Sequence, residues 1–488
     1  MRHLPDKPAK IANKDQVHMT TTAFSSLPFS SLFLGPELLA NIQSLDYQVM
    51  TPIQAQSLPA ILKGKDLLAQ AKTGTGKTAA FAIGLLHKLE VRTYQTQALV
   101  LCPTRELADQ VSTEIRRLAR AVPNTRIITL CGGKPMAPQL ASLEHNPHIV
   151  VGTPGRILKH LEKETLKLDG LKTLVLDEAD RMLDMGFHED IMRIIDKTPR
   201  QRQTLLFSAT YPDEIKDISD AIQNDPVDVR VESVHDNKKI KQVFYEIENG
   251  ERTKTLVALL QHYRPESSLV FCNTKQQCQE LAEELWQQGF QALALHGDLE
   301  QRERDQVLVQ FANKSSPILI ATDVAARGLD INDLHAVINF ELSPEPEVHI
   351  HRIGRTGRAD KEGLALSLFM ASEQFRVDAI EEYKNSPVSI DKTASLQTPE
   401  HKTQKNFRPG PPMVTLCIKG GRKDKVRAGD ILGALTANTE LSGNQIGKID
   451  IFDKLAYVAV ESPVAGQALK ILTEGKIKGR KFRVQKLH

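Results

Sequence analysis

Short runs of hydrophobic residues alternate with longer amphipathic stretches along most of the chain, from about residue 38 to residue 380. The hydrophobic runs have the length of buried strands and cover residues 98–102, 148–151, 173–176, 204–207, 268–271, 317–321 and 336–339. Between them, stretches such as 105–120 and 276–288 have the spacing of amphipathic helices. Strands that are hydrophobic at nearly every position are typical of a parallel sheet covered on both faces. The pattern therefore predicts an α/β fold with doubly wound parallel sheets.

The alternating pattern falls into two blocks, which we expect to be separate domains. The first covers residues 23–230 and the second residues 240–385, and the polar stretch 232–241 forms a hinge between them. Residues 1–22 are polar and are expected to be a disordered N-terminal extension. A linker is expected over residues 386–412, because its final Arg-Pro-Gly-Pro-Pro can build neither a helix nor a central strand.

The last unit, residues 413–488, has a different order of elements. Strands are expected over 413–418, 446–452, 455–460 and 481–484, and helices over 428–435 and 464–472. The order βαββαβ is that of an α+β domain of the RNA-recognition (RRM) type. Only Phe452 and Tyr457 are aromatic near its central strands, which is few for base stacking. Two modes of RNA binding are therefore alternatives for this domain: stacking of bases on the sheet, and contacts from basic side chains.

The charge of the chain is distributed unevenly. The whole chain has 63 basic and 60 acidic residues, a net charge of +3, but residues 401–488 contain 17 basic and 7 acidic residues. The other 400 residues are therefore mildly acidic. A small basic unit on an acidic body indicates a nucleic-acid-binding appendage. The alternative is a structural or partner-docking module with a solvated lysine-rich face.

The cysteines and the hydrophobic runs indicate the compartment. Five cysteines are scattered along the chain without a Cys-x-x-Cys pair, so neither a disulfide framework nor a zinc site is expected. No hydrophobic run approaches the 18 residues of a membrane span, and the N-terminus lacks the hydrophobic core of a secretory signal. These features predict a cytoplasmic protein without a membrane partner.

A phosphate-binding loop is the first motif that carries chemistry. Residues 71–78 read Ala-Lys-Thr-Gly-Thr-Gly-Lys-Thr and stand between a hydrophobic run and a helical stretch, although the usual first residue is Gly. Gly74 and Gly76 let the backbone wrap phosphates closely, and the N-terminus of the helix stabilises their negative charge. Lys77 is expected to reach the β- and γ-phosphates and Thr78 to bind Mg²⁺. The motif predicts ATP and Mg²⁺ as cofactors.

An acidic partner for this loop follows another hydrophobic run. Residues 174–180 read Leu-Val-Leu-Asp-Glu-Ala-Asp. Asp177 can hold Mg²⁺, and Glu178 can orient and polarise the attacking water. Adjacent carboxylates could also serve only as a helix cap, but together with the phosphate loop they predict nucleotide hydrolysis.

Residues 177–180 spell Asp-Glu-Ala-Asp, and the chain resembles the DEAD-box family of ATP-dependent RNA helicases over residues 24–385. The other motifs of the family stand in order as Thr-Pro-Ile-Gln at 51–54, Pro-Thr-Arg-Glu-Leu at 103–107, Gly-Gly at 132–133, Thr-Pro-Gly-Arg at 153–156, Ser-Ala-Thr at 208–210, His-Gly-Asp-Leu-Glu-Gln at 296–301, Ala-Thr-Asp-Val-Ala-Ala-Arg-Gly-Leu-Asp at 321–330 and His-Arg-Ile-Gly-Arg-Thr-Gly-Arg at 351–358. The resemblance implies two tandem RecA-like domains, ATP hydrolysis stimulated by RNA, and local unwinding of short RNA duplexes.

Further stretches resemble a bacterial branch of this family and extend the match into the C-terminal unit. They cover residues 95–102, 119–124, 129–133, 416–418, 429–435 and 475–479. That branch acts on large-subunit (23S) ribosomal RNA during assembly of the 50S subunit, which implies a hairpin of the peptidyl-transferase region and a 50S precursor as partners. An ATP-gated RNA clamp with little unwinding and a DNA translocase are the alternative functions. A monomer is expected, because one chain contains both halves of the ATP site.

The resemblance also implies the residues that bind the nucleotide. Gln54 would read the adenine edge, and either Phe29 or Phe24 would stack on the ring. Nearby, Asp46 and Met50 replace the usual Gly and Pro of the family, which affects the expected shape of the loop. The full nucleotide-binding set is Phe29, Thr51, Gln54, Thr73, Gly74, Thr75, Gly76, Lys77, Thr78 and Asp330, with Mg²⁺ held by Thr78 and Asp177.

Two arginines of the second block resemble the arginine fingers of the family. Arg355 and Arg358 would meet the charge of the transition state only when the two domains close, so that ATP and RNA favour each other's binding. Lys77, Asp177 and Glu178 complete the implied catalytic set. Residues implied to couple the two sites are Ser208, Thr210 and His351.

RNA would lie across both domains, held mainly through its phosphates and 2′-hydroxyls and so without sequence preference. The residues that match family RNA contacts are Thr104, Arg105, Gly133, Thr153 and Arg156 in the first block and Gly297, Gln301, Arg304, Thr322 and Asp323 in the second. In the C-terminal unit the basic clusters 419–427 and 476–483 supply the candidates Lys419, Arg422, Lys423, Lys425, Lys478 and Arg480.

Overall fold

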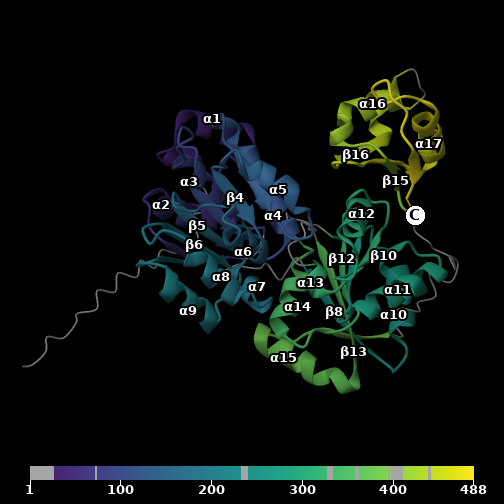
Figure 1. Cartoon of the computed structure of the whole chain (residues 1–488). Helices are drawn as coiled ribbons and strands as arrows, with labels where there is room; N and C mark the ends of the chain where they lie inside the picture. Colours follow the sequence, from purple (N-terminus) through teal and green to yellow (C-terminus); the bar gives the residue numbers. More distant parts are fainter. Residues whose placement is uncertain are drawn as a thin grey trace, which may run out of the picture. The chain divides into compact units, whose positions relative to one another are not determined.

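Two seven-stranded sheets and one four-stranded sheet organise the chain (Figure 1). The computed structural model describes residues 27–71, 74–231, 240–326, 334–357, 362–393, 396, 410–437 and 441–487. The chain divides into two units, one up to residue 234 and one from residue 235. The expected N-terminal extension, residues 1–22, lies outside the described residues.

The first unit contains a sheet with the strand order β3-β4-β2-β5-β6-β1-β7, in which every pair of neighbours is parallel. Its strands are β1 Leu67–Gln70, β2 Ala98–Leu101, β3 Ile127–Leu130, β4 Ile149–Gly152, β5 Thr173–Asp177, β6 Gln203–Ser208 and β7 Val227–Arg230. The sheet is doubly wound, because helices cover both of its faces. The expected α/β fold of the first block is confirmed.

Helices cover both faces of this sheet. They are η2 Phe29–Ser31, α1 Pro36–Ser44, α2 Pro52–Leu62, α3 Lys77–His87, α4 Arg105–Leu118, η3 Ala119–Ala121, α5 Met136–Leu143, α6 Pro154–Glu162, α7 Ala179–Asp184, α8 His188–Ile195 and α9 Asp213–Ile222. Alternate residues of one strand belong to the hydrophobic cores on opposite faces of the sheet. Leu67 and Ala69 pack with α2, α3 and α4, whereas Leu68 between them packs with α6, α8 and α9. This explains why the central strands are hydrophobic at nearly every position.

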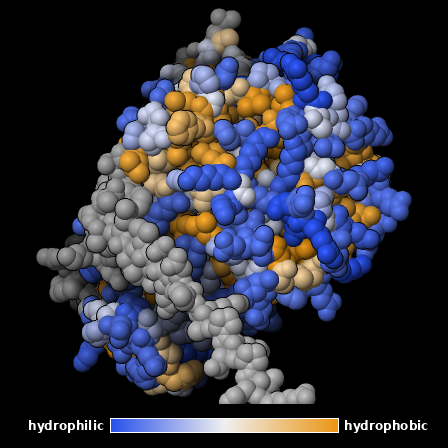
Figure 2. All heavy atoms as spheres, turned by 90° about the vertical axis from the view of Figure 1, so that its left-hand side faces the viewer, coloured by the Kyte–Doolittle hydropathy of each residue, from blue (hydrophilic) through white to orange (hydrophobic). Residues whose placement is uncertain are grey.

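The surface is mostly polar. Figure 2 shows one face on which hydrophilic residues predominate and hydrophobic residues appear in groups between them. Among the described residues of the first unit, Phe33, Tyr94 and Val49 are the most exposed large hydrophobic side chains. No helix in the described part of the chain combines the length and the hydrophobicity that a membrane crossing requires.

The loop before α2 keeps the backbone shape of a glycine at a position that has none. Asp46 has φ 66°, in the left-handed region, and its Oδ1 accepts a hydrogen bond from Gln48 Nε2 at 3.3 Å. Asp tolerates this region better than most residues. Met50, in place of the usual Pro, is buried in the core with Phe29. Asp46 therefore keeps a left-handed backbone without a glycine, and Met50 adds a side chain to the core.

The second unit begins with another parallel sheet, of strand order β10-β11-β9-β12-β13-β8-β14. Its strands are β8 Ile240–Ile247, β9 Ser268–Phe271, β10 Ala292–Leu295, β11 Ile318–Ala321, β12 Ala336–Asn339, β13 Gly363–Met370 and β14 Ile390–Lys392. The short strand β14 pairs with β8 and lies within the segment that we expected to be linker. The second sheet therefore extends beyond residue 385.

Seven helices and one-turn segments of the described residues surround this sheet. They are α10 Arg252–Tyr263, α11 Lys275–Gln287, α12 Gln301–Ala312, α13 Asp323–Ala326, α14 Pro346–Ile353, η4 Ala371–Glu373 and α15 Gln374–Lys384. Leu256 of α10 and Leu281 of α11 belong to the core on one face. Phe311 of α12 and Ala325 of α13 belong to a core that uses the alternate strand residues. The architecture of the first domain is thus repeated.

The C-terminal domain has a four-stranded antiparallel sheet of order β16-β17-β15-β18. Its elements are β15 Met413–Ile418, η7 Arg422–Asp424, α16 Ala428–Thr436, η8 Gly443–Gln445, β16 Ile446–Ile451, β17 Ala456–Glu461, η9 Ser462–Val464, α17 Ala465–Glu474 and β18 Val484–Lys486. One face of the sheet packs on α16 and α17. The βαββαβ order and the RRM-like fold are confirmed, with the last strand a few residues later than expected.

The other face of this small sheet packs against α12 of the second parallel-sheet domain. Cys417 and Tyr457 form one buried cluster with Val309 of α12. At its margin Thr415 Oγ1 accepts a hydrogen bond from Asn313 Nδ2 at 3.2 Å and lies 2.6 Å from Ser315 Oγ. We refer to this contact as the α12 seam. The C-terminal domain is therefore joined to the second parallel-sheet domain by side-chain contacts as well as by the linker that the sequence indicates.

Candidate functional site

The nucleotide-binding candidates of the first unit gather at one edge of its sheet. The carboxyl ends of parallel strands meet at the same edge, and β5, β6 and β1 are neighbours in the strand order. The phosphate loop follows β1, Asp177 ends β5, and Ser208 ends β6. Ala71 N–H donates to Ser208 O at 3.0 Å, which ties the phosphate loop to the end of β6. Segments distant in sequence thus form one site.

The phosphate loop has the backbone that its glycines allow. Gly74 and Gly76 have φ values of 83° and 94°, and Gly76 is the N-cap of α3. Lys77 begins α3, is buried, and donates from Nζ to Ala71 O at 2.7 Å. Its ammonium therefore lies across the loop, where the phosphates of a nucleotide would replace the carbonyl as its partner. Thr78 follows it, half-buried, whereas Thr73 lies outside the described residues.

Gln54 of α2 also contacts the phosphate loop, at Gly76. The side chain is 1% exposed, donates from Nε2 to Gly76 O at 3.1 Å, and accepts from Thr51 N–H at 2.9 Å. A Cβ atom at Gly76 would lie 2.5 Å from Gln54 Nε2, so this close approach requires glycine. Gln54 thus supports the phosphate loop, and Thr51 N–H fixes its orientation. Reading of the adenine edge by Gln54 stays a prediction.

The two adjacent carboxylates after β5 differ in their surroundings. Burial raises the pKa of Asp177 to about 7, against the opposing effect of nearby Lys77. Glu178 has φ 55°, which turns the chain into α7, and its side chain is only 3% exposed. Its carboxylate lies 3.1 Å from Arg181 Nη1, but neither of its oxygens has a hydrogen-bond partner. A buried carboxylate with open acceptor positions is suited to bind a water molecule.

The residues at this edge fit a magnesium ion. Mg²⁺ prefers oxygen ligands and usually keeps several waters while it binds one or two protein groups and the substrate phosphates. Thr78 offers a hydroxyl and Asp177 a buried carboxylate, whose pKa burial raises in spite of nearby Lys77. No group of three or more His, Cys, Asp or Glu side chains suited to a metal occurs among the described residues.

Asp180 connects the acidic motif to the Ser-Ala-Thr motif. Its Oδ2 accepts hydrogen bonds from Thr210 N–H at 2.9 Å, Thr210 Oγ1 at 3.0 Å and Ala209 N–H at 3.1 Å. Burial works to raise the pKa of Asp180, but Lys77 and the bonds from Thr210 outweigh it, and the pKa lies below its ordinary value. The sequence indicated a coupling role for Thr210 but did not single out Asp180 as its partner.

The candidate adenine-stacking ring is not at the surface. Phe29 is 1% exposed, belongs to the core of the first domain, and packs with its ring centroid 6.1 Å from that of Tyr47. Tyr47 in turn donates to Glu114 at 2.6 Å. Phe24, the alternative, lies outside the described residues. Stacking on adenine stays a prediction for both.

The RNA-binding candidates of the first unit occupy the other half of the same sheet edge. They follow β2, β3 and β4, which are neighbours in the strand order. Thr104 is the N-cap of α4 and accepts Leu107 N–H at 3.2 Å, and Thr153 is the N-cap of α6. Arg156 donates to Lys134 O at 3.0 Å, which links the loops after β3 and β4. The sheet edge thus places these candidates beside the nucleotide-binding set.

Gly133 makes room for a guanidinium group in this set. Its φ is 68°, and a Cβ atom there would lie 1.8 Å from Arg105 Nη1. No side chain can be added without displacing Arg105, a residue at the first turn of α4. The glycine therefore allows the left-handed turn and also leaves space for the side chain of Arg105.

We expect Gly133→Ala to raise the RNA concentration for half-maximal stimulation of ATP hydrolysis about tenfold. This loss of affinity corresponds to ~1.4 kcal/mol, which is within the usual cost of an overpacked side chain. Hydrolysis without RNA should not change. The measurement is the RNA concentration for half-maximal stimulation. Gly186→Ala is the matched control, because Gly186 has φ 76° but nothing within 4 Å of its Cβ position. Equal effects of both substitutions would mean that backbone strain, not Arg105, explains the loss.

The second sheet repeats this arrangement. The RNA-binding candidates Gly297, Gln301 and Arg304 follow β10, Thr322 follows β11, and α14 with His351 follows β12. Thr322 is buried, and its Oγ1 accepts Ala325 N–H at 3.3 Å. The structure also describes Arg355, which follows α14 directly. The candidates Asp330 and Arg358 lie outside the described residues.

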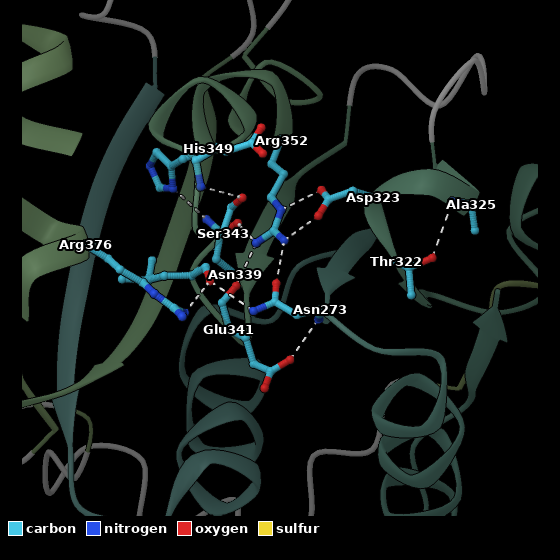
Figure 3. Close-up of polar contacts among 12 residues, drawn as sticks. Asn273, Thr322, Asp323, Ala325, Asn339, Glu341, Ser343, His349, Arg352 and Arg376 are labelled. Carbon is cyan, nitrogen blue, oxygen red and sulfur yellow. Dashed lines mark hydrogen bonds and ion pairs between the residues drawn. The ribbon is translucent and has the colours of Figure 1, made fainter. Parts of the chain in front are cut away.

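Arg352 is the centre of a polar network that the sequence did not single out (Figure 3). Its guanidinium is 2% exposed and lies over the ring of Phe271. It donates to both oxygens of Asp323 at 2.7 Å, and to Asn339, Asn273 and the carbonyl of Glu341. The structure thus gives Asp323 an internal partner, and its role as an RNA contact stays a prediction.

The two basic clusters of the C-terminal domain lie side by side. Lys478 Nζ donates to Lys425 O at 3.1 Å, and Lys419 N–H donates to Arg483 O at 2.9 Å. The other candidates Arg422, Lys423 and Arg480 are exposed on these segments. In contrast, Tyr457 is 1% exposed, because the α12 seam covers its face of the sheet. Phe452, the other aromatic residue near the central strands, is half-buried at the same seam. The basic side chains are therefore the more exposed of the two candidate RNA-binding sets.

Comparisons with known proteins match this architecture domain by domain. The DEAD/DEAH box helicase family model matches residues 51–218, the helicase conserved C-terminal domain matches 251–360, and the DbpA RNA binding domain matches 415–486. The chain is 44% identical to the ATP-dependent RNA helicase CshA of Listeria monocytogenes, over 72% of this chain and 68% of that protein. Among solved structures, Dbp5 of S. cerevisiae bound to RNA and ADP BeF3 has a TM-score of 0.67 and 31% identity, and the match covers 75% of this chain and 96% of that one.

The chain therefore belongs to the DEAD-box family of ATP-dependent RNA helicases, with two RecA-like domains and a C-terminal RNA-binding domain. It is 52% identical to the ATP-dependent RNA helicase DbpA of Escherichia coli, over 96% of this chain and 100% of that protein. The bacterial branch that the sequence indicated is the DbpA type, and this resemblance is confirmed.

Proposed function

We propose that this helicase acts on 23S ribosomal RNA in a precursor of the 50S subunit, as a monomer in the bacterial cytoplasm. The C-terminal domain would bind a hairpin of the peptidyl-transferase region, and the two RecA-like domains would unwind short duplexes near it. The match to a DbpA RNA binding domain and the similarity to DbpA over the whole chain support the proposal.

One observation supports our proposal that the C-terminal domain binds a structured RNA. Two basic segments that are 53 residues apart at Lys425 and Lys478 lie side by side, while the face that would stack bases is covered. Lysines and arginines grouped in this way would contact the phosphates of a folded RNA and follow its shape. The domain is thus suited to a hairpin and not to an unpaired strand.

For the reaction itself, we propose that Lys77 and Thr78 bind the phosphates and Mg²⁺ of ATP together with Asp177. The magnesium ion would neutralise charge on the β- and γ-phosphates. Glu178 would orient the attacking water through its open carboxylate oxygens, and its partner Arg181 would hold it in place. Arg355 and Arg358 would stabilise the charge of the transition state.

We further propose that the sheet edge couples the two ligands. In the first domain the RNA set follows β3, β4 and β2 and the ATP set follows β5, β6 and β1, so that one edge presents both. Asp180 and Thr210 join two of the ATP-side loops. Each ligand would then favour the conformation that binds the other, and the coupling free energy is the same in both directions.

The test is steady-state ATP hydrolysis by the full chain with three nucleic acids in parallel. They are a 23S fragment containing the peptidyl-transferase hairpin, an unrelated RNA of equal length, and DNA of the matching sequence. We expect the 23S fragment to stimulate at the lowest concentration. Lys423→Glu and Arg480→Glu should each weaken this stimulation and lower the slope of log affinity against log salt by about one.

Lys470→Glu is the matched control, because Lys470 is exposed on α17 of the same domain but outside both basic clusters. It should behave as the unmodified chain does. Equal stimulation by both RNAs would overturn the proposed specificity for 23S RNA, although the chain would remain an RNA-stimulated enzyme. Stimulation by DNA as strong as that by the 23S fragment would instead support the translocase alternative.

A further inference from the structure

Three consecutive carbonyl groups after β12 accept hydrogen bonds from three arginines of different helices. We call residues 340–342 the clasped segment. Its first carbonyl accepts from Arg252 of α10, its second from Arg352 of α14 at 2.6 Å, and its third from Arg376 of α15 at 2.9 Å. Figure 3 shows Arg352 and Arg376 on either side of the segment at Glu341. Three guanidinium groups thus satisfy three successive carbonyl groups that lie outside the regular hydrogen bonding of the sheet.

Further contacts connect the three arginines to one another and to the sheet. Glu373 accepts a hydrogen bond from Arg252 and forms an ion pair with Arg376 at 3.5 Å. Arg252 also donates to Leu368 O at 3.3 Å, at the end of β13. Asn273, at the end of β9, donates to the third carbonyl of the clasped segment at 3.1 Å. The segment is therefore fixed to three neighbouring strands.

The clasped segment leads directly into the helix that carries the candidate ATP-site residues of this domain. Only residues 343–345 separate it from Pro346, the first residue of α14. That helix carries His351 and Arg352, and Arg355 follows its last turn. Because the connection is so short, a displacement of the clasped segment would be transmitted to the whole helix.

We propose that Arg252 and Arg376 are positioning residues for ATP hydrolysis. Together with Glu373 they hold the clasped segment, and through α14 they fix the orientation in which Arg355 meets the transition state. Neither arginine belongs to a motif that indicated a role in the reaction. The inference rests on the role proposed above for Arg355.

This role differs from a contribution to stability alone. An arginine finger acts on charge that develops in the transition state, so its displacement lowers kcat and leaves ground-state binding of ATP to the first domain unaffected. Loss of folded protein would lower the apparent enzyme concentration and the melting temperature together. If a residue acts only through Arg355, its substitution should no longer lower kcat when Arg355 has already been replaced. The effects on kcat of residues that act as a unit are not additive.

The experiment compares Arg376→Gln, Arg355→Gln and the double variant in the full chain at saturating RNA. Arg355→Gln should lower kcat by at least about a hundredfold. Arg376→Gln should lower it about tenfold with the KM for ATP within about twofold, and Arg376→Lys should restore part of the loss. The double variant should have the kcat of Arg355→Gln. Arg252→Gln provides a second test from another helix, with the same expected pattern.

Lys254→Gln is the matched control, because Lys254 lies on α10 near Arg252 but forms only an exposed pair with Glu251. A kcat for Arg376→Gln and Arg252→Gln within about twofold of the unmodified chain would overturn the inference. So would a double variant whose losses multiply, because Arg376 would then act independently of Arg355. A fully active Arg355→Gln enzyme is a different failure, which removes the proposed arginine finger itself.

Discussion

Replacing Glu178 by Gln should lower the RNA-stimulated kcat by about 10²–10⁴-fold, the usual contribution of a positioned general base. The carboxylate is buried, has no hydrogen-bond partner on either oxygen, and is held by Arg181 at 3.1 Å. An amide has nearly the same shape but cannot accept the proton of water, so ATP and RNA should still bind. The variant should therefore accumulate with both ligands bound.

Two measurements check this expectation. Single-turnover hydrolysis reports the chemical step, and retention of labelled RNA in the presence of ATP reports the trapped state. Glu162→Gln is the control, because Glu162 forms an exposed ion pair with Arg193 on the same domain. Normal turnover by the Glu178 variant would show that another group activates the water.

Replacing Lys77 by Ala should affect binding of the nucleotide instead. Truncation of one partner of a buried charged contact costs about 2–5 kcal/mol, so we expect kcat/KM for ATP to fall by about 30-fold to about 4,000-fold. The loss has a second cause in this site. Lys77 lowers the pKa of both Asp177 and Asp180, so without it Asp177, whose pKa is about 7, would be protonated more often and would bind Mg²⁺ less well.

Equilibrium binding of a fluorescent ATP analogue and steady-state kinetics measure this effect. Lys63→Ala is a suitable control, because Lys63 is an exposed lysine at the C-cap of α2 in the same domain. An unchanged affinity for the nucleotide in the Lys77 variant would be incompatible with a phosphate contact at this position.

The sequence predicted most of the central strands and missed the edge strands, and it also missed the largely buried strand β13, which pairs with β12 and β8. β2 and β5 are buried at every position, so each leaves an uninterrupted hydrophobic run. β7 and β14 lie at the ends of their sheets and are mostly exposed, and β8 has buried and exposed residues mixed. An edge strand is fixed by hydrogen bonds to its neighbour, and that pairing leaves no hydrophobic run in the sequence.

The same distinction applies to the candidate site. Residues of the phosphate loop are contiguous, so their spacing alone indicates their chemistry. Contacts such as Asp180 with Thr210, or Arg352 with Asp323, join segments about 30 residues apart. Gln54 shows a further limit, because a side chain expected to read adenine is bound to Gly76 O of the phosphate loop. Local motifs identify such residues, but only the fold shows what they contact.

The α12 seam has a consequence for engineering. RNA-binding domains are often moved between proteins as independent modules, but this one uses a sheet face as an attachment surface. A chimera that joined residues 410–487 to a different helicase core would leave Cys417 and Tyr457 without Val309 and Thr415 without Asn313. The unit to transplant is therefore the C-terminal domain together with α12 and its following turn, so that the sheet face keeps the helix that covers it.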